Sequence, residues 1–551
     1  MKSRLFAALP LLAAVAIPAL PAIAAPAAEA TPRPKLVVMI SVDQFSADIF
    51  AEYRGRYTQG FKRLADGAVF PSGYQSHGAT ETCPGHSTLL TGSRPARTGI
   101  IANNWFDLSL PRPDKRVYCA EDPAEPGSSS EDYVPATQYL KVPTLGDRMK
   151  RANPADRVVS VAGKDRAAIM MGGHATDQIW FWGGKGFVTL KDHAATPVPA
   201  AIAPANSAAN ALIARDEKQA LPTVCAAKSV AVPVGNRTVG TLDVRKAGSE
   251  RGFRASPSFD AAIGGLAIAL IDEMKLGRGQ GTDLLTIGLS ATDYVGHGFG
   301  TEGAEMCAQQ IALDATIGRI LTALDKTGVP YAVALSADHG GHDLPERNQQ
   351  HGFDDAHRIP NGESASAIGE ALAKEFGLKG ATLFADGPAG DIYLARDIPA
   401  AIRPQVLASA RARFLADPDV EAMFTADELR RVRPSGLPIE EWPLAERFAA
   451  SFDPERSGDL VVALKARVTP IAKPTGTVAT HGSPWNYDRR VPILFWWPGM
   501  RGFEQPNGIE TVDIMPTLAA LIHVPAPREE IDGRCLDLDA TAATTCGSVM
   551  R

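Results

Sequence analysis

Short apolar runs recur along the chain and stop abruptly at polar residues. They read KLVVMISVD (35–43), RVVSVAG (157–163), DLLTIGLSATD (283–293), YAVALSAD (331–338) and VPILFWWPG (491–499). Short apolar segments bounded by turn residues are typical of buried strands. We therefore expect five buried strands, and we expect them to be parallel.

Longer amphipathic patterns lie between or after these runs. They cover 261–276, 304–328 and 512–524. Strands that alternate with amphipathic helices predict an α/β layered fold with a mostly parallel central sheet flanked by helices.

Several segments interrupt this alternation. Residues 105–145 and 180–255 are rich in Pro, Gly, Ala and Ser and are expected to form loops and excursions. Residues 345–478 contain two further helical patterns (363–376 and 401–416) and a strand pattern at 458–468. We therefore expect a catalytic core whose first part is 36–344, an inserted cap region at 345–478, and a final core part at 479–551.

The first 25 residues have the order of a secretory signal. Lys2 and Arg4 precede the apolar run LFAALPLLAAVAIPAL, and small residues follow it. Pro10 and Pro18 within the run argue against a retained membrane helix, so we expect a signal peptide at 1–25, no stable membrane anchor, and a periplasmic or secreted product.

The composition is that of an ordinary globular protein, with 45% hydrophobic and 21% charged residues. Loss of Lys2 and Arg4 would move the formal net charge from −6 to −8. A mildly acidic chain argues against nucleic acid as a partner.

Six cysteines are present in a chain that we expect to be exported, where disulfides form. Their spacing does not indicate a cysteine metal site. Cys535 and Cys546 could close a small loop, and Cys119 could pair with Cys225. Cys83 is interpreted as a buried structural cysteine.

Carboxylates and imidazoles stand at or near the ends of several predicted strands. They are Asp43, Asp293 with His297, Asp338 with His339, and His481 before the last strand. Ligands of open α/β sheets bind beyond the carboxyl ends of the strands, so these groups are expected to meet at one edge. Taken alone, each has a structural explanation, such as a strand-end cap for Asp43 or a loop position for His481. Together, their number and their mixed N/O chemistry favour two zinc-like metal ions.

The segment ATETCPGHSTLLTG (79–92) offers several hydroxyl groups as nucleophile, namely Thr80, Thr82, Ser87, Thr88 and Thr91. Thr82 precedes Cys83-Pro84, where a helix can begin, and a helix N-terminus favours a phosphate oxyanion. The alternative is that Thr82 is only the N-cap of that helix.

Lys164 and Arg166 follow the second apolar run, two positions apart. In an extended or turn segment, alternate side chains face the same side, so both could reach one anion. A solvated surface pair is the alternative. Two cationic side chains would suit a dianionic phosphate monoester better than a singly charged diester.

The set SVDQF (41–45), TETCPGHSTLLTG (80–92), ATDYVGH (291–297), ADHGGH (337–342) and THG (480–482) resembles the alkaline phosphatase superfamily. Within it, the chain resembles exported bacterial alkaline phosphatases with a threonine nucleophile (the Sphingomonas type), which are kin to nucleotide pyrophosphatase/phosphodiesterases. The resemblance implies that one zinc is held by Asp293, His297 and His481, and the other by Asp43, Asp338, His339 and the oxygen of Thr82.

The same resemblance implies that Thr82 is the nucleophile and that Asn103 donates its amide to a phosphoryl oxygen, with Asn104 the adjacent competitor. Lys164 and Arg166 match the phosphate-binding pair of the threonine-type phosphatases. A carboxylate set for a third, magnesium site is not evident, so two Zn²⁺ ions per chain are expected. The other histidines, among them His86 and His342, receive no role.

The expected function is that of a monomeric, zinc-dependent alkaline phosphatase (EC 3.1.3.1). It would hydrolyse small phosphate monoesters through a covalent phosphothreonine. The alternatives are a phosphodiesterase or nucleotide pyrophosphatase on the same site, and an exported metal- or phosphate-binding protein without turnover. A sulfatase fits less well, because CPGH does not continue into a sulfatase motif.

Overall fold

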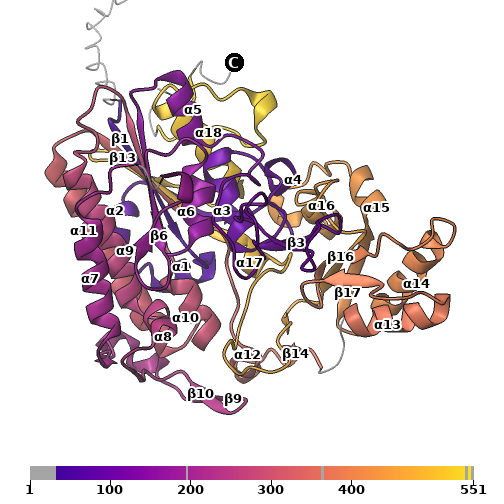
Figure 1. Cartoon of the computed structure of the whole chain (residues 1–551). Coiled ribbons are helices and arrows are strands. Elements are labelled where there is room, and N and C mark those ends of the chain that lie inside the picture. Colours follow the sequence, from indigo (N-terminus) through magenta and orange to yellow (C-terminus); the bar gives the residue numbers. More distant parts are fainter. Residues whose placement is uncertain (1–32, 194–195, 361–364, 540–543, 548–551) are drawn as a thin grey trace, which may run out of the picture. The chain divides into compact units, whose positions relative to one another are not determined.

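A large central sheet contains the apolar runs of the sequence (Figure 1). The computed structural model describes residues 33–193, 196–360, 365–539 and 544–547, so the predicted signal peptide at 1–25 lies outside the described residues. From Pro34 onward the chain forms one compact unit.

Five adjacent strands of the sheet are parallel. In spatial order they are β13 (Tyr331–Ser336), β1 (Leu36–Val42), β12 (Asp283–Leu289), β5 (Arg157–Ala162) and β6 (Gln178–Trp182). Because the strands are parallel, their carboxyl ends lie along one edge of the sheet.

Helices cover both faces of this sheet, which explains why its strands are continuously apolar. Val38 and Ile40 of β1 pack in a cluster with α9 (Pro257–Glu273) and α11 (Ala304–Thr327). Val37 and Met39 pack in a second cluster, which includes side chains from α5 (Leu145–Ala152) and α18 (Ile514–Leu521). The expected α/β layered fold is confirmed.

The direction of the last core strand differs from the expectation. Strand β20 (Arg490–Trp496) is antiparallel to both β13 and β2 (Ala68–Tyr74), so the prediction of a parallel strand at 491–499 is wrong. An apolar run does not encode direction, because a strand buried on both faces reads the same either way. The antiparallel direction places the start of β20 beside the end of β13, which brings the preceding segment with His481 to the same edge.

Residues 345–478 contain a second, smaller sheet with its own apolar cluster. The sheet is antiparallel and comprises β15 (Leu383–Ala385), β16 (Gly390–Leu394), β18 (Leu460–Leu464) and β17 (Val420–Thr425), in that spatial order. Helices α13 (Ala365–Phe376) and α14 (Arg403–Leu415) pack on it, at the positions of the two predicted helical patterns.

Three disulfides join cysteines in the described part of the chain: Cys83–Cys119, Cys225–Cys307 and Cys535–Cys546. The pairing of Cys535 with Cys546 is confirmed, whereas a Cys119–Cys225 bond is wrong. Tertiary packing decides these partners, since Cys307 lies on α11 and Cys225 in a short segment packed beside it. Among the described helices, none has the length and hydropathy needed to cross a membrane.

Candidate metal centre and active site

Side chains that can bind a metal ion emerge at the shared carboxyl edge of the parallel strands. Asp43 directly follows β1, and Asp338 and His339 follow β13. Asp293 does not end a strand as expected, because β12 ends at Leu289 and Asp293 lies in the first turn of α10 (Ala291–Phe299). The helix places His297 one turn further on the same face, as a spacing of four residues requires.

Asp43, Asp338 and His339 form the first group that could hold a metal ion. His339 Nε2 lies 3.5 Å from Asp43 Oδ1 and 3.3 Å from Asp338 Oδ2, and all three side chains are buried. These are the residues expected for one of the two ions.

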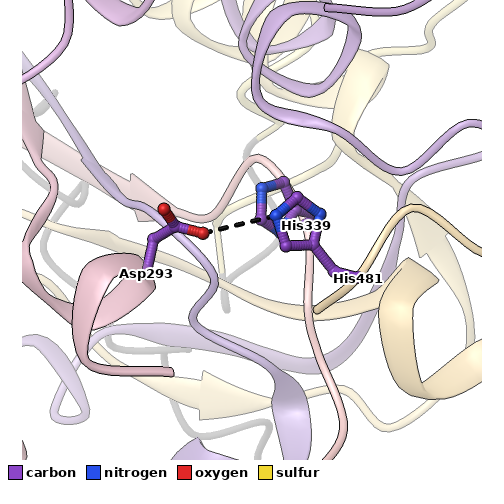
Figure 2. A group of neighbouring side chains, drawn as sticks. All are labelled: Asp293, His339 and His481. Atoms are coloured by element: carbon purple, nitrogen blue, oxygen red, sulfur yellow. Dashed lines mark ion pairs between the residues drawn. The ribbon is translucent and has the colours of Figure 1, made fainter. Parts of the chain in front are cut away.

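Asp293 lies at the centre of the second group. His297 Nε2 and His481 Nε2 each lie 3.3 Å from Asp293 Oδ1. Figure 2 shows Asp293 facing His339 and His481, whose rings stack with centroids 3.6 Å apart. The second group that could hold a metal ion is therefore Asp293, His339 and His481. The predicted ligand His297 contacts Asp293 but does not belong to this group, whereas His339 is shared by both groups.

The backbone orients the three imidazoles. The Nδ1 groups of His297, His339 and His481 donate to the carbonyls of Ala479, Gly340 and Thr80 at 2.8–2.9 Å. Each Nε2 is thereby left as the bare nitrogen that faces the carboxylates. Anchoring one ring nitrogen in this way is the usual arrangement of metal-binding histidines.

The chemistry of these residues fits a metal ion. Asp43 Oδ1, Asp338 Oδ2 and His339 Nε2 are buried and have no hydrogen-bond partner among the described residues. Burial lowers the pKa of His339 to about 3, so its imidazole is neutral, as a ligand must be. Lone pairs that converge on one another in a buried site indicate a cation between them, and the mixed nitrogen and oxygen donors suit zinc or a similar metal.

Lys164 connects the two groups electrostatically. Its Nζ lies 2.8 Å from Asp43 Oδ2, 2.6 Å from Asp293 Oδ2 and 3.4 Å from Thr82 Oγ1. Burial and the nearby Asp338 raise the pKa of Asp43 well above its usual value. Burial also acts to raise the pKa of Asp293, but Lys164 and His297 hold it well below its usual value. The cluster of carboxylates therefore needs positive charge.

Thr82 is the first residue of α3 (Thr82–Thr91), and Glu81 occupies the N-cap position. Thr82 is therefore not itself the N-cap, which was the alternative explanation for this residue. The helix approaches the site closely, since a Cβ atom at Gly85 would lie 1.9 Å from the carbonyl oxygen of Asp338. A larger residue at position 85 would push the Thr82 hydroxyl away from the metal-binding edge.

Asn103 and Arg166 lie at the border of the same site. Asn103 Oδ1 accepts a hydrogen bond from the Cys83 N–H at 2.8 Å, which places its amide beside the start of α3. Lys164 is the N-cap of α6 (Asp165–Gly172) and has an extended backbone, but the helix begins at Asp165, so the expectation that 164–166 is an extended or turn segment fails at Arg166. Arg166 lies in the first helical turn, and its Nη1 donates to the Tyr118 hydroxyl at 3.3 Å.

Sequence reasoning missed three residues of this site. His86 Nδ1 lies 3.1 Å from Asp338 Oδ2 and 2.9 Å from the Thr82 carbonyl. Glu81 contacts Asn103, and Tyr118 contacts Arg166. The spacing of four residues between Thr82 and His86 was an available signal, because it places both on one helix face.

A cavity of about 350 Å³ adjoins the metal-binding edge. Core residues such as Glu81 and Trp105, residues of the 345–478 region such as Asp391 and Tyr393, and His481 line it. The 345–478 region therefore contributes a wall to the space beside Glu81 and His481.

Comparisons with known proteins agree with this arrangement. The family described as type I phosphodiesterase / nucleotide pyrophosphatase matches residues 37–484. Alkaline phosphatase PhoD of Zymomonas mobilis is 54% identical over 93% of this chain and 89% of its own length. Alkaline phosphatase PhoK of a Sphingomonas species is also 54% identical, over 94% of this chain and 93% of its own. The crystal structure of alkaline phosphatase PafA superposes with a TM-score of 0.78 at 27% identity, covering 90% of this chain and 97% of that one.

Proposed function

Because the chain belongs to the type I phosphodiesterase/nucleotide pyrophosphatase family of the alkaline phosphatase superfamily, we propose that it is a zinc-dependent alkaline phosphatase. Its substrates would be small phosphate monoesters, and its reaction would pass through a phosphothreonine at Thr82. The two highly similar alkaline phosphatases and the position of Thr82 at the metal-binding edge support this proposal.

Each ion has a proposed set of ligands. Asp43, Asp338, His339 and the Thr82 oxygen would hold one zinc, and Asp293, His297 and His481 the other. When bound, zinc lowers the pKa of a coordinated hydroxyl or water and withdraws charge from phosphoryl oxygens.

The reaction then needs two displacements at phosphorus. The deprotonated Thr82 oxygen forms a bond to phosphorus while the bond to the alcohol oxygen breaks, which releases the alcohol after it gains a proton. Water then attacks the phosphothreonine, so that inorganic phosphate leaves and the Thr82 hydroxyl is restored. Asn103, Lys164 and Arg166 would hold the phosphoryl oxygens through both steps.

The position of Lys164 is the observation that carries the choice of a monoester. Two zinc ions balance three carboxylates and the Thr82 alkoxide, so Lys164 and Arg166 would leave two net positive charges. A monoester dianion matches that excess, whereas a diester carries one negative charge fewer.

Phosphodiester hydrolysis is the second candidate, because the matching family is described by that activity. The zinc-loaded protein would be given a monoester and a diester with the same aryl leaving group. We expect a much higher kcat/KM for the monoester. A higher value for the diester would transfer the function to the phosphodiesterase branch.

The nucleophile is tested separately. Brief incubation with substrate at acidic pH, followed by mass spectrometry, should find one phosphoryl group on Thr82 in the wild type and none in Thr82→Ala. Thr80→Ala is the matched control, since its hydroxyl donates to the Ser483 carbonyl and is not directed at Lys164. Labelling of Thr82→Ala at another residue would refute the proposed nucleophile.

Three further properties belong to the proposal. Residues 345–478 would act as a cap inserted between core parts 36–344 and 479–551, because they have their own sheet and line the cavity. Cleavage of residues 1–25 would deliver the chain to the periplasm or medium as a monomer. Fractionation, N-terminal sequencing and size-exclusion chromatography test these points.

A further inference from the structure

The Asn103 segment is tied to the start of α3 by several bonds at once. The Asn103 N–H donates to Glu81 Oε2 at 2.7 Å, and the Cys83 N–H donates to Asn103 Oδ1 at 2.8 Å. The Cys119 N–H donates to the Asn103 carbonyl at 2.9 Å, and a disulfide joins Cys119 to Cys83. Three residues, Glu81, Cys83 and Cys119, therefore fix the backbone and the side chain of Asn103 at the start of α3.

These bonds also determine which end of the Asn103 amide is available. A side-chain amide has one oxygen acceptor and two N–H donors. The oxygen is occupied by the Cys83 N–H, so the nitrogen is the end left to donate to an anion. The proposed role of Asn103, which is to donate to a phosphoryl oxygen, requires the amide nitrogen.

Glu81 behaves unlike an ordinary N-cap residue. It occupies the N-cap position of α3, yet its side chain makes no capping hydrogen bond to that helix. Its carboxylate bonds the Asn103 N–H instead. A capping residue that turns away from its own helix indicates that its side chain serves the neighbouring segment.

The disulfide anchors a whole hairpin to the nucleophile helix. Strands β3 (Asn104–Phe106) and β4 (Arg116–Tyr118) pair, so that Asn103 precedes one strand and Cys119 follows the other. The Tyr118 hydroxyl, at the end of β4, accepts from Arg166 Nη1 and donates to Asp165 Oδ1 at 2.8 Å. The hairpin thus contacts two of the proposed phosphate-binding residues.

We propose that Glu81 and the Cys83–Cys119 disulfide are positioning residues that hold the Asn103 amide where it donates to a phosphoryl oxygen. This inference rests on the proposed function, because it takes Asn103 as a phosphate ligand. Displacement of a donor by about 1 Å can reduce the rate by about 100-fold, so the fixing of Asn103 would matter for turnover.

A double-mutant cycle tests the role of Glu81. Glu81→Ala should lower kcat/KM for an aryl phosphate monoester by about 10- to 100-fold in the wild-type background, but by less than about 2-fold in Asn103→Ala, since an absent amide cannot be misplaced. The inhibition constant of inorganic phosphate should rise in the same pattern. Glu81→Gln should restore most of the activity, because its carbonyl oxygen still accepts from the Asn103 N–H.

Equal losses in the two backgrounds would overturn the inference, as would a Glu81→Gln enzyme as weak as Glu81→Ala. If Glu81→Ala fails to fold, Glu81→Asp enters the same cycle, because its shorter side chain separates the carboxylate from Asn103. Wild-type activity in the Asn103→Ala single mutant would instead show that Asn103 does not bind phosphate. That result would refute this part of the proposed function, and the inference would fail with it.

The disulfide is tested by comparing two cysteine pairs. Cys83→Ala with Cys119→Ala should raise the inhibition constant of inorganic phosphate by about 10-fold or more in the wild-type background and leave it nearly unchanged in Asn103→Ala. Cys535→Ala with Cys546→Ala removes a disulfide remote from Asn103, and it should lower stability without affecting phosphate inhibition. The same inhibition change from both pairs would show only a general loss of stability and would overturn the role of Cys83–Cys119.

Discussion

Lys164 contacts a carboxylate from each of the two candidate metal groups as well as the Thr82 hydroxyl. A charge-assisted hydrogen bond contributes about 1.5–3 kcal/mol, so Lys164→Ala should lower kcat/KM for a phosphate monoester by about 10- to 100-fold. The loss for a diester with the same aryl group should be several-fold smaller, because the diester carries less charge. Steady-state kinetics of both esters checks this.

Lys326→Ala is the matched control for that experiment, since Lys326 is an exposed cation on α11. It should leave both esters unaffected. Equal losses for monoester and diester in Lys164→Ala would contradict a role in recognising the second negative charge of the monoester.

Two backbone N–H groups orient the Asp338 carboxylate. Its Oδ1 accepts from the Gln44 and His339 N–H groups, which leaves Oδ2 directed at the His339 ring. Asp338→Asn should weaken zinc binding by at least about 100-fold, because it replaces a charged ligand with a neutral one. Equilibrium dialysis with metal analysis measures this independently of activity.

The exposed Asp325→Asn on α11 serves as control and should retain the wild-type zinc content. The zinc-loaded wild type should also melt at a higher temperature than the chelated protein, since ligand binding stabilises the native state by mass action. Full zinc occupancy in Asp338→Asn would remove Asp338 from the ligand set.

At the scale of elements, helix α5 is attached to the core through the Asp147 carboxylate. Asp147 accepts from the Thr144 N–H in a capping box and from His174 Nδ1 at 3.0 Å. The hydrogen bond that His174 donates to Asp147 raises the pKa of His174. The stabilising effect of the pair is therefore complete below the unfolded His pKa of about 6.5 and is lost as the pH rises through the higher folded value.

The free energy of unfolding should accordingly fall as the pH rises above about 6.5, by no more than about 1 kcal/mol because the imidazole is partly exposed. Burial acts to raise the pKa of Asp147, but the hydrogen bonds that it accepts from His174 and Thr144 lower the pKa below its usual value. The contribution of the Asp147 carboxylate to stability is therefore lost only when the pH falls below the usual carboxylate range. Urea unfolding over a pH series, with His174→Gln, checks the slope. A slope unchanged in His174→Gln would show that another group titrates.

The strands and helices of the core could be predicted because few folds are compatible with an alternation of strands and helices. The runs at 35–43 and 331–338 end in Asp43 and Asp338, and parallel strands must place those ends on one edge. The sequence pattern did not predict the antiparallel direction of β20 or the position of Asp293 in a helix. An apolar strand pattern is the same in both directions, and a strand that ends four residues early leaves no change of hydropathy to mark it.

Contacts between distant segments were also beyond sequence reasoning. The partner of Cys83 and the bond from Asn103 to Glu81 depend on how the 103–119 hairpin packs on α3. Local propensity carries no information on such packing, since each segment is compatible with several neighbours. The ligands were predictable from residue type and position, whereas the residues that position them were not.

For the whole molecule, a cavity lies between the core and the 345–478 region, and we expect it to select the leaving groups of the proposed reaction. Its wall includes the carboxylates of Glu81, Asp386 and Asp391. Asp386 is exposed and paired with Arg116, while burial raises the pKa of Asp391 to about 6. At the alkaline pH proposed for catalysis, Asp391 is therefore ionised and its charge opposes a leaving group that is itself negative.

Neutralising that charge should alter selectivity more than activity. Asp391→Asn should raise kcat/KM for a carboxyphenyl phosphate, relative to phenyl phosphate, by about 3- to 10-fold, as expected for one charge removed at several ångströms in a partly screened site. Glu421→Gln removes an exposed carboxylate from β17 that does not line the cavity, and it should leave the ratio unchanged. An unchanged ratio in Asp391→Asn would mean that the leaving group does not enter this cavity, and that the 345–478 region contacts the substrate elsewhere or not at all.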